Sequence, residues 1–248
     1  MQKLITFGCS YTAGFLNDGS IPLKGAYRDY YDWRGGNFPK IYPELLSEQN
    51  NLQLHNYASQ GSSNSLQFWK ATESYHTWNK DDIIVFQSTF VQRLEFLNSI
   101  IDGYEWHILE SDPHPSTEKT YNPSISYKAQ EELLISRDNI LQNREVIAYV
   151  RAMKALADAK QCHFLWVPFD TYSLEYVLDR EKECRDVIDL MVTHTPKDGT
   201  MTIIDDLPEE IKGTITKETN GIVDDNHYGE IGNKTQAEII SPYLRRFL

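Results

Sequence analysis

Short runs of apolar residues, each ending in polar or small residues, recur along this chain and predict its strands. The runs cover residues 3–7, 52–57, 82–87, 163–168 and 201–205. They are nearly continuous rather than alternating, which is typical of strands buried on both faces of a parallel sheet. The run at 82–87 is the clearest of the five, and the run at 52–57 is weaker.

Helical patterns lie between these runs, with apolar residues three and four positions apart. They cover residues 42–48, 65–75, 129–160, 174–191 and 234–247. Strands that alternate with helices predict a parallel sheet with helices packed on both faces. We therefore expect a single α/β domain over residues 1–248, a flavodoxin-like three-layer α/β/α sandwich with a central sheet of about five parallel strands.

Two stretches, residues 15–40 and 100–127, fit this alternation poorly. We expect both to be loop insertions near the functional site, because long loops in compact domains usually carry function or move. The first is rich in aromatic side chains, which suit either packing against the edge of the sheet or stacking on sugar rings. These aromatic residues are Tyr27, Tyr30, Tyr31 and Trp33.

The charge balance narrows the classes of partner. The chain has 24 Lys and Arg against 36 Asp and Glu, a formal net charge of −12. An acidic surface disfavours nucleic acid and anionic membrane, because phosphate binding rests on Lys and Arg. With neither an apolar run of about 18 residues nor a secretion signal, we expect a cytoplasmic protein. The three cysteines show no Cys-x-x-Cys spacing, which predicts reduced thiols and no metal site.

The ligand site of an open α/β sheet lies beyond the carboxyl ends of its strands, so the segment after the first strand is a candidate. There residues 8–12 read Gly-Cys-Ser-Tyr-Thr, which places Ser10 on a tight turn. The segment lacks the glycines of a dinucleotide fingerprint, the lysine of a phosphate loop and the second glycine of Gly-x-Ser-x-Gly. When this segment is considered alone, Ser10 is better explained as the N-cap of a helix than as a nucleophile.

A histidine and a carboxylate near the other end of the chain change this interpretation. Asp224 and His227 are three residues apart and precede the last predicted helix. A serine hydroxyl is a poor nucleophile until a base takes its proton, and the base works best when a carboxylate fixes its tautomer. Ser10 together with Asp224 and His227 therefore indicates a catalytic serine more specifically than either segment does alone. Asp225 is the alternative carboxylate.

Three segments in this order resemble the SGNH or GDSL hydrolase family. Residues 8–12 resemble its Gly-Asp-Ser-x-Thr block with Cys in the place of Asp, and residues 56–64 resemble its second block. The segment from Asp224 to His227 matches its fifth block. The resemblance implies the SGNH hydrolase fold, with Ser10 as nucleophile, His227 as general base and Asp224 as the carboxylate that orients it.

The resemblance also implies an oxyanion hole formed by the N–H groups of Ser10 and Gly61. The family's third block, Gly-x-Asn-Asp, has no counterpart here, because the third predicted strand runs into a segment without Asn. Another residue must then supply the side-chain donor, and the candidates are Asn64, Gln87, Ser88 and Thr89. The alternative for Asn64 is a cap on the second helix. Arg93 suits either an anionic group of the substrate or a surface salt bridge.

These residues imply a carboxylic ester hydrolase that works through an acyl-enzyme on Ser10, without a metal or cofactor. The family acts on acyl esters, thioesters and O-acetylated sugars. An acidic chain with an aromatic loop favours a small ester or an O-acetyl carbohydrate over bulk lipid as the substrate. Two alternatives remain: an acyltransferase with the same triad, and a non-catalytic carbohydrate-binding protein that has kept the fold.

Overall fold

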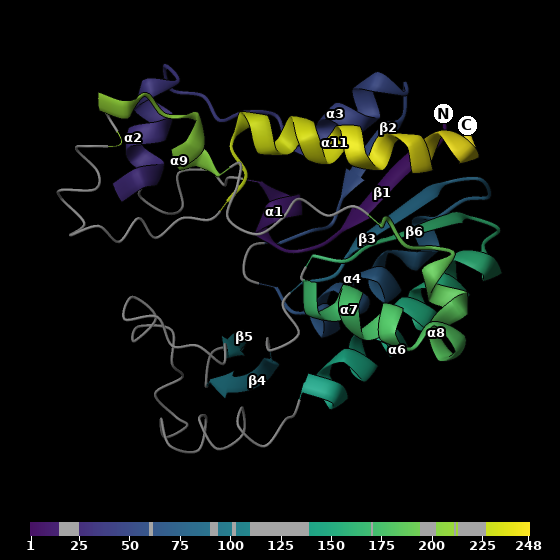
Figure 1. Ribbon diagram of the computed structural model, residues 1–248. Helices are drawn as coiled ribbons and strands as arrows, with labels where there is room; N and C mark the ends of the chain where they lie inside the picture. Colours follow the sequence, from purple (N-terminus) through teal and green to yellow (C-terminus); the bar gives the residue numbers. More distant parts are fainter. Residues whose placement is uncertain are drawn as a thin grey trace.

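The computed structural model is a parallel sheet between two layers of helices, which confirms the predicted α/β/α sandwich (Figure 1). It describes residues 1–14, 25–59, 62–89, 94–100, 103–109, 139–169, 171–193, 202–210, 212 and 227–248. The sheet contains β1 (Lys3–Phe7), β2 (Gln53–Asn56), β3 (Ile83–Gln87) and β6 (His163–Val167). Their order is β2-β1-β3-β6, and every neighbouring pair is parallel.

The register of these strands brings their carboxyl ends to one edge of the sheet. Phe7, the last residue of β1, pairs with Phe86 of β3, and Gln87 of β3 pairs with Val167 of β6. The segments that follow β1, β3 and β6 therefore begin side by side. This is the edge at which open α/β sheets bind their ligands.

Two helices cover one face of the sheet, α3 (Tyr42–Gln49) and α11 (Glu230–Leu244), as Figure 1 shows. Successive strand residues point to opposite faces, and Leu4 is among those that point to these helices. The buried side chains between the two layers are Leu4, Tyr42, Leu46, Ile83, Val85, Leu165, Val167, Val192, Ala237, Ile240 and Leu244. Each large apolar side chain buried in this way stabilises the fold by about 1.5–3 kcal/mol.

Four helices cover the opposite face: α4 (Asn64–Ser74), α6 (Asn139–Ala159), α7 (Thr171–Asp179) and α8 (Glu181–Ile188). The core on this side is the more aromatic of the two. The strands contribute Ile5, Phe7, Ile84, Phe86, Phe164 and Trp166 to it, and the helices contribute apolar residues such as Val150, Met153, Val177 and Val187.

Most helices match their predicted ranges. The patterns at 42–48, 65–75 and 234–247 correspond to α3, α4 and α11, and α11 continues into a short 3-10 helix, Arg245–Phe247. Of the pattern at 129–160, residues 129–138 lie outside the described residues. The single helix predicted over 174–191 is wrong, because the chain turns at Arg180, where φ is −118° and ψ is 39°, and starts again as α8.

The fifth predicted strand, residues 201–205, is also wrong. The described part of this run forms a short helix, α9 (Ile203–Asp206), preceded by one antiparallel bridge between Thr202 and Tyr228. The carboxylate of Asp205 accepts hydrogen bonds from the N–H and the hydroxyl of Thr202, a local pairing that favours a helix start over a strand. Beside β6, a single parallel bridge to Met191 occupies the next position of the sheet.

The two expected insertions contain regular structure. The first holds a helix, α2 (Gly25–Trp33), and residues 15–24 lie outside the described residues. The second overlaps an antiparallel hairpin of β4 (Leu94–Ile100) and β5 (Gly103–Leu109). Residues 110–127 of the second insertion again lie outside the described residues.

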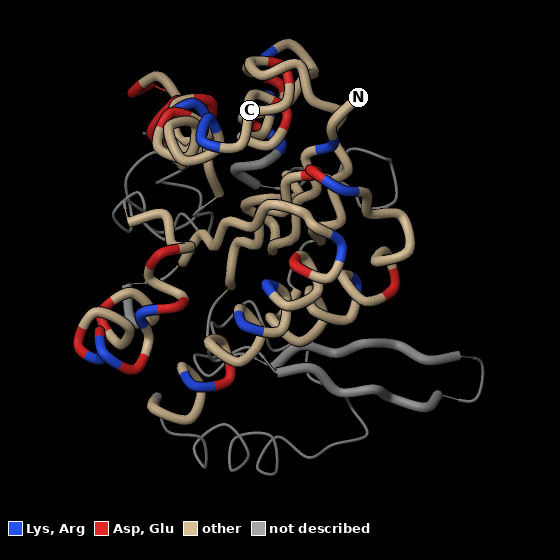
Figure 2. Tube along the Cα trace, turned by 90° about the vertical axis from the view of Figure 1, so that its right-hand side faces the viewer, with Lys and Arg blue, Asp and Glu red and all other residues tan. Residues whose placement is uncertain are grey.

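Both chain ends lie at the end of the molecule opposite α1, and charged residues of both signs are spread along the outer helices (Figures 1 and 2). The three cysteines are buried and form no disulfide. Among the described helices, none has the length and apolar character needed to cross a membrane.

Candidate active site

The segment after β1 forms the predicted tight turn. Cys9 has an extended backbone, and the one-turn helix α1 (Ser10–Ala13) begins directly after it. The N–H groups of Thr12 and Ala13 donate to the Cys9 carbonyl at 3.0 and 2.9 Å. Because Ser10 opens this helix, its own N–H has no carbonyl partner within α1. Ser10 therefore presents a hydroxyl and an N–H from one turn at the carboxyl edge of the sheet, and it is 5% exposed.

A buried chain of hydrogen bonds holds this turn on the sheet. The Thr12 hydroxyl donates to Oε1 of Gln87 at the end of β3, and it lies 3.1 Å from the hydroxyl of Tyr42 on α3. All three side chains are buried. Burial raises the pKa of Tyr42. Because the Thr12 hydroxyl donates to Gln87, the Tyr42 hydroxyl is the donor to Thr12.

Gly8 lies against this chain, and no larger residue fits there. A Cβ at Gly8 would lie 2.8 Å from Cβ of Thr12, closer still to its hydroxyl, and 3.2 Å from Cβ of Gln87. We expect Gly8→Ala to lower the free energy of unfolding by about 1–3 kcal/mol, the usual cost of overpacking a core. Urea unfolding measures this cost.

A second background tests the physical reason for that cost. In a Thr12→Ala background the hydroxyl that meets the new methyl group is gone, so Gly8→Ala should cost less there than in the wild-type chain. An equal cost in both backgrounds would mean that contact with Thr12 is not the cause.

The loop after β2 supports the turn from another side. The N–H of Ser59 and the hydroxyl of Ser62 both donate to the carbonyl of Gly8 at 3.1 Å. The predicted oxyanion donor Gly61 lies between these two residues and outside the described residues. Ser59 and Ser62 are thus anchored to the backbone two residues before Ser10.

Asn64, the first residue of α4, joins this helix to the loop after β3. Its Nδ2 donates to the carbonyl of Thr89 at 3.1 Å, and its Oδ1 accepts from the N–H of Thr89 at 2.8 Å. The cap of α4 is Ser63, whose hydroxyl accepts from Leu66 N, so the capping alternative for Asn64 is wrong. The amide instead forms a two-bond clamp on the Thr89 backbone, and Asn64 is 5% exposed.

We expect Asn64→Ala to destabilise the fold, because both buried backbone groups of Thr89 lose their Asn64 partner. The free energy of unfolding should fall by about 1–3 kcal/mol. The control is Asn79→Ala, because Asn79 is exposed and its side-chain amide makes one long bond of 3.4 Å to Thr77. The control should stay within about 0.5 kcal/mol of wild type. Equal losses of unfolding free energy in both variants would show that the two Asn64 bonds stabilise the fold no more than the single Asn79 bond does.

The other candidate donors lie at the end of β3. Gln87 is bound through Oε1 to Thr12, as described above. The Ser88 hydroxyl faces the core, where it accepts from the indole of Trp166 at 3.1 Å. Thr89 is bound through its backbone to Asn64. Arg93 lies outside the described residues.

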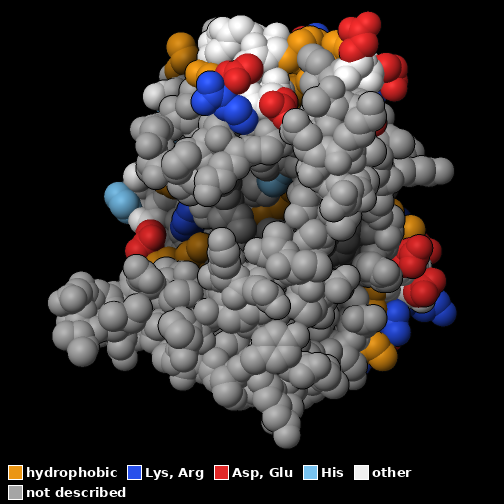
Figure 3. Space-filling model, turned by 90° about the vertical axis from the view of Figure 1, so that its left-hand side faces the viewer, with side chains coloured by type: hydrophobic (Ala, Val, Ile, Leu, Met, Phe, Trp, Pro, Cys, Tyr) orange, Lys and Arg blue, Asp and Glu red, His pale blue; other side chains and the backbone are white. Residues whose placement is uncertain are grey.

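His227 reaches the same edge from the far end of the sequence. Its ring centroid lies 5.1 Å from that of Tyr11, the residue after Ser10, and the two ring planes are inclined by 24°. The carbonyl of His227 accepts from Ile203 N at 2.9 Å, which fixes the backbone. The structure thus brings His227 next to the helical turn that begins at Ser10. Figure 3 shows this end of the molecule.

The carboxylates predicted to accompany the histidine, Asp224 and Asp225, lie outside the described residues. What the described chain does show is how the segment after His227 is held. Asn233 on α11 donates to the carbonyls of Tyr228 and Gly229 at 3.2 and 2.9 Å. Its Oδ1 accepts from Tyr42 N at 2.9 Å. Asn233 therefore links the histidine segment to α3, whose Tyr42 hydroxyl lies against the Ser10 turn.

Sequence reasoning missed Asn233. The one available signal was an amide on the buried face of an otherwise amphipathic helix, where it is 1% exposed. Buried amides are hydrogen-bonded in folded proteins, so such a position indicates a specific partner. The sequence gives no indication which partner that is.

A second connection holds the start of α11. Asp206 accepts from Glu230 N and from the hydroxyl of Tyr30, the latter at 2.7 Å. Burial, and then the bond to Asp206, raises the pKa of Tyr30. A Cβ at Gly229 would collide with the Asp206 carboxylate, so this close approach requires glycine. The aromatic segment expected to stack on sugars therefore packs, through Tyr30, against the base of the histidine segment.

Glu230 adds an ion pair at this point. It lies 2.6 Å from Nζ of Lys234 and 2.5 Å from the guanidinium of Arg34. The hydrogen bond from Lys234, and then that from Arg34, lowers the pKa of Glu230 to about 2. Its carboxylate is 39% exposed, so solvent screens much of the interaction and the pair contributes little to stability.

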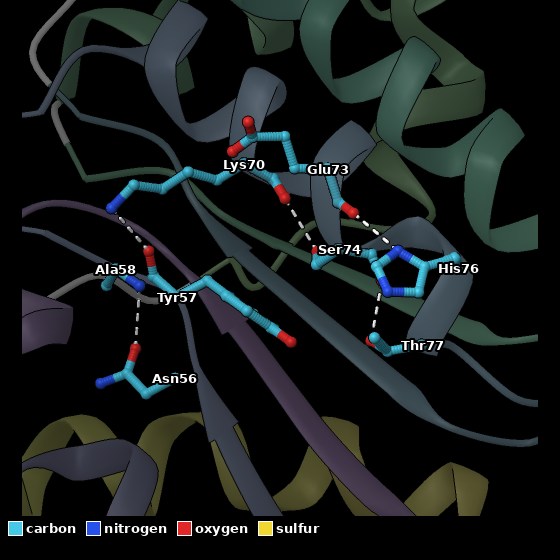
Figure 4. A pocket seen from close by; sticks show the side chains of 8 residues that line it. All are labelled: Asn56, Tyr57, Ala58, Lys70, Glu73, Ser74, His76 and Thr77. Atoms are coloured by element: carbon cyan, nitrogen blue, oxygen red, sulfur yellow. Dashed lines mark hydrogen bonds between the residues drawn. The ribbon is translucent and has the colours of Figure 1, made fainter.

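A separate cavity of about 470 Å³ lies between β2 and α4 (Figure 4). Its lining carries charges of both signs on Lys70 and Glu73, with His76 beside them. Asn56 connects it to the Ser10 turn, since its Nδ2 donates to the Thr12 carbonyl at 2.8 Å. Within the described part of the chain, no group of three His, Cys, Asp or Glu residues is arranged to hold a metal ion.

Comparison with known proteins gives neighbours in structure but none in sequence. No protein-family model matches the chain, and no curated protein matches its sequence. A member of the lipolytic G-D-S-L family from Veillonella parvula is 12% identical with a TM-score of 0.46, over 99% of this chain and 100% of that one. A putative lipolytic G-D-S-L protein from Desulfitobacterium hafniense is 8% identical with a TM-score of 0.47, over the whole of both chains.

A third neighbour is a carbohydrate esterase whose active site is described as having divergent catalytic and non-catalytic binding functions. It is 12% identical with a TM-score of 0.47, over 100% of this chain and 70% of that one. Likeness at this level assigns neither an activity nor a substrate to the present chain.

Proposed function

We propose that this protein is a serine ester hydrolase of the SGNH or GDSL type, with Ser10 as nucleophile, His227 as general base and Asp224 as the carboxylate that orients the base. The observation that carries the proposal is the stack of His227 on Tyr11, the neighbour of Ser10. Two segments at opposite ends of the sequence, each proposed for one role, meet at the carboxyl edge of the sheet. Ile203 binds the carbonyl of His227, and Asn233 and Asp206 bind the three residues that follow it. These bonds fix the histidine segment at this edge of the sheet.

The chemistry follows from these positions. His227 accepts the proton of the Ser10 hydroxyl while Oγ attacks the ester carbonyl, and the carbonyl oxygen becomes an oxyanion. The N–H groups of Ser10 and Gly61 stabilise this charge. The protonated imidazole then gives its proton to the departing alcohol, which leaves an acyl group on Ser10. A water molecule, deprotonated by His227, releases the acid and restores the serine.

The side-chain donor of the oxyanion hole is proposed among Asn64, Gln87, Ser88 and Thr89 from the bonds that each already makes. Both bonds of the Asn64 amide run to the Thr89 backbone, which fixes the orientation of this amide, and the Ser88 hydroxyl faces the core beside Trp166. Oε1 of Gln87 accepts from Thr12, which ties this side chain to the Ser10 turn, and its amide nitrogen would be the donor. Gln87 is therefore the best-supported replacement for the Asn of the family, with Thr89 next.

The proposed substrate is a small acyl ester or an O-acetyl group, including one on a carbohydrate, and the proposed reaction needs no metal or cofactor. The proposed setting is the cytoplasm, with neither nucleic acid nor membrane as a partner, in keeping with the net charge of −12. Arg93 remains a proposed contact for an anionic group of the substrate.

One observation favours a second candidate function. The clamp holds the Asn64 amide, a candidate donor of the oxyanion hole, on the Thr89 backbone. Loss of one such donor costs about 2.7–4 kcal/mol of transition-state stabilisation. A chain without this donor suits a carbohydrate-binding protein that has kept the fold, whereas the contact of His227 with Tyr11, the neighbour of Ser10, supports the enzyme. An acyltransferase would use the same acyl-enzyme with a hydroxyl group in place of water.

A series of 4-nitrophenyl esters tests the proposal. We expect hydrolysis with the highest kcat/KM for acetate, a lower value for butyrate and lower values again for longer chains. Added sugar alcohols that accelerate nitrophenol release without releasing acetate would identify the acyltransferase. Absence of turnover with every ester would favour the binding protein.

A further inference from the structure

Tyr11 is the contact through which α1 touches the histidine segment. Its ring and the imidazole of His227 are 5.1 Å apart between centroids and inclined by only 24°. This is an offset stack, one of the arrangements that aromatic rings prefer. Because Tyr11 directly follows Ser10 in the chain, its ring places the imidazole relative to the backbone at Ser10.

Other rings hold Tyr11 in place. Phe169, from the loop after β6, lies 4.3 Å from its centroid at an angle of 43°. Tyr228, the residue after His227, lies 4.9 Å away at 70°, edge to face. Tyr11 is 9% exposed and belongs to a small apolar cluster with Cys9, Tyr228 and Phe169. Rings from two other segments thus pack on Tyr11, and its ring in turn stacks on His227.

We propose that Tyr11 is a positioning residue that holds the imidazole of His227 in the orientation needed to take the proton of Ser10, an inference that rests on the proposed function. Proton transfer requires the donor and acceptor atoms within about 2.6–3.2 Å. A misplacement of about 1 Å lowers the rate by as much as a hundredfold. The electron-rich face of the ring also favours the imidazolium that forms after the transfer. Both effects need the aromatic ring and neither needs its hydroxyl.

The test compares variants of Tyr11 in the full chain with 4-nitrophenyl acetate as substrate. We expect Tyr11→Leu and Tyr11→Met to lower kcat by about 10- to 100-fold with KM changed less than about threefold. Tyr11→Phe keeps the ring and should retain at least about half of the wild-type kcat. Two different aliphatic replacements guard against the failure of one of them to fold, which thermal unfolding of each variant reports.

A second histidine stack in this protein supplies the matched control. Phe247 lies over His163 with centroids 4.5 Å apart and planes inclined by 9°. His163 opens β6, at the amino edge of the sheet and away from Ser10. Phe247→Leu therefore removes a ring stack on a histidine outside the proposed site, and it should leave kcat unchanged.

A measurement that does not depend on turnover accompanies the kinetics. The proton shift of the His227 ring in NMR, assigned with His227→Gln, should move by a ring-current effect in Tyr11→Leu and stay in place in Tyr11→Phe. Equal kcat in wild type and both aliphatic variants, with reaction of Ser10 intact, would overturn the role of Tyr11 and leave the proposed function standing. A wild-type protein whose Ser10 neither turns over esters nor reacts with a fluorophosphonate would overturn both. Loss of kcat in Tyr11→Phe equal to that in Tyr11→Leu would also overturn the inference, since it would assign the effect to the hydroxyl.

Discussion

Replacement of Ser10 by alanine is expected to lower kcat for 4-nitrophenyl acetate by on the order of 10⁵–10⁶-fold, the loss seen when the nucleophile of a serine triad is removed. In the proposed mechanism the Oγ of Ser10 becomes bonded to the acyl group, so no neighbour would substitute for it. The fold should persist, because Ser10 opens a one-turn helix and the bonds that hold this turn come from Thr12 and the backbone. Steady-state kinetics and thermal unfolding on the same preparation measure both effects.

The matched control is Ser47→Ala on α3. Ser47 is a buried serine whose hydroxyl donates to the carbonyl of Glu44 within its own helix, far along the chain from the proposed site. This variant should keep wild-type kcat. If Ser10→Ala retains more than about a hundredth of the wild-type rate, the nucleophile lies elsewhere.

Replacement of the proposed base and its carboxylate should have the next largest effects. His227→Gln removes the group that accepts the serine proton, and we expect a loss of kcat on the order of 10³-fold or more. Asp224→Asn should cost on the order of 10³–10⁴-fold, because the imidazole then adopts the wrong tautomer. Asp225→Asn should change kcat less than about threefold, the scale of effect expected from a residue outside the triad.

The control is an exposed histidine, and the comparison of the two aspartate variants identifies the triad carboxylate. His76→Gln changes a histidine whose Nδ1 is bonded to the Glu73 carbonyl at the end of α4, and it should leave kcat unchanged. A larger loss in Asp225→Asn than in Asp224→Asn would move the triad carboxylate by one residue. Activity in His227→Gln close to that of wild type would remove the histidine from the mechanism.

The central sheet was predictable because its strands are buried on both faces. Such strands appear as uninterrupted apolar runs, and the runs at 3–7, 82–87 and 163–168 gave the positions of β1, β3 and β6. The run at 201–205 has the same appearance, but Asp205 pairs with Thr202 and Asp206 binds the start of α11. The local pairing and the bond to the distant helix both favour a helix here, and the apolar run alone indicates neither of them.

The residues of the candidate site also divide into those that the sequence indicates and those that long-range contacts place. The placement of Ser10 follows from the end of an apolar run and the turn after it, and the sequence motif indicated it. The clamp of Asn64 on Thr89, the bonds of Asn233 and the stack of Tyr11 on His227 each join residues that are distant in sequence. One sequence does not reveal such pairs, although the buried amides were visible as polar residues among apolar neighbours.

Reaction with a fluorophosphonate probe, followed by mass spectrometry of the labelled peptide, tests the central claim most directly. These probes bond to a serine only when a neighbouring base has activated it, so the label reports the Ser10 and His227 pair without any assumption about the substrate. We predict one label on the peptide that carries Ser10, no label in Ser10→Ala, and labelling slowed on the order of a hundredfold or more in His227→Gln. An unlabelled wild-type protein, or a label on any other serine, would contradict the account.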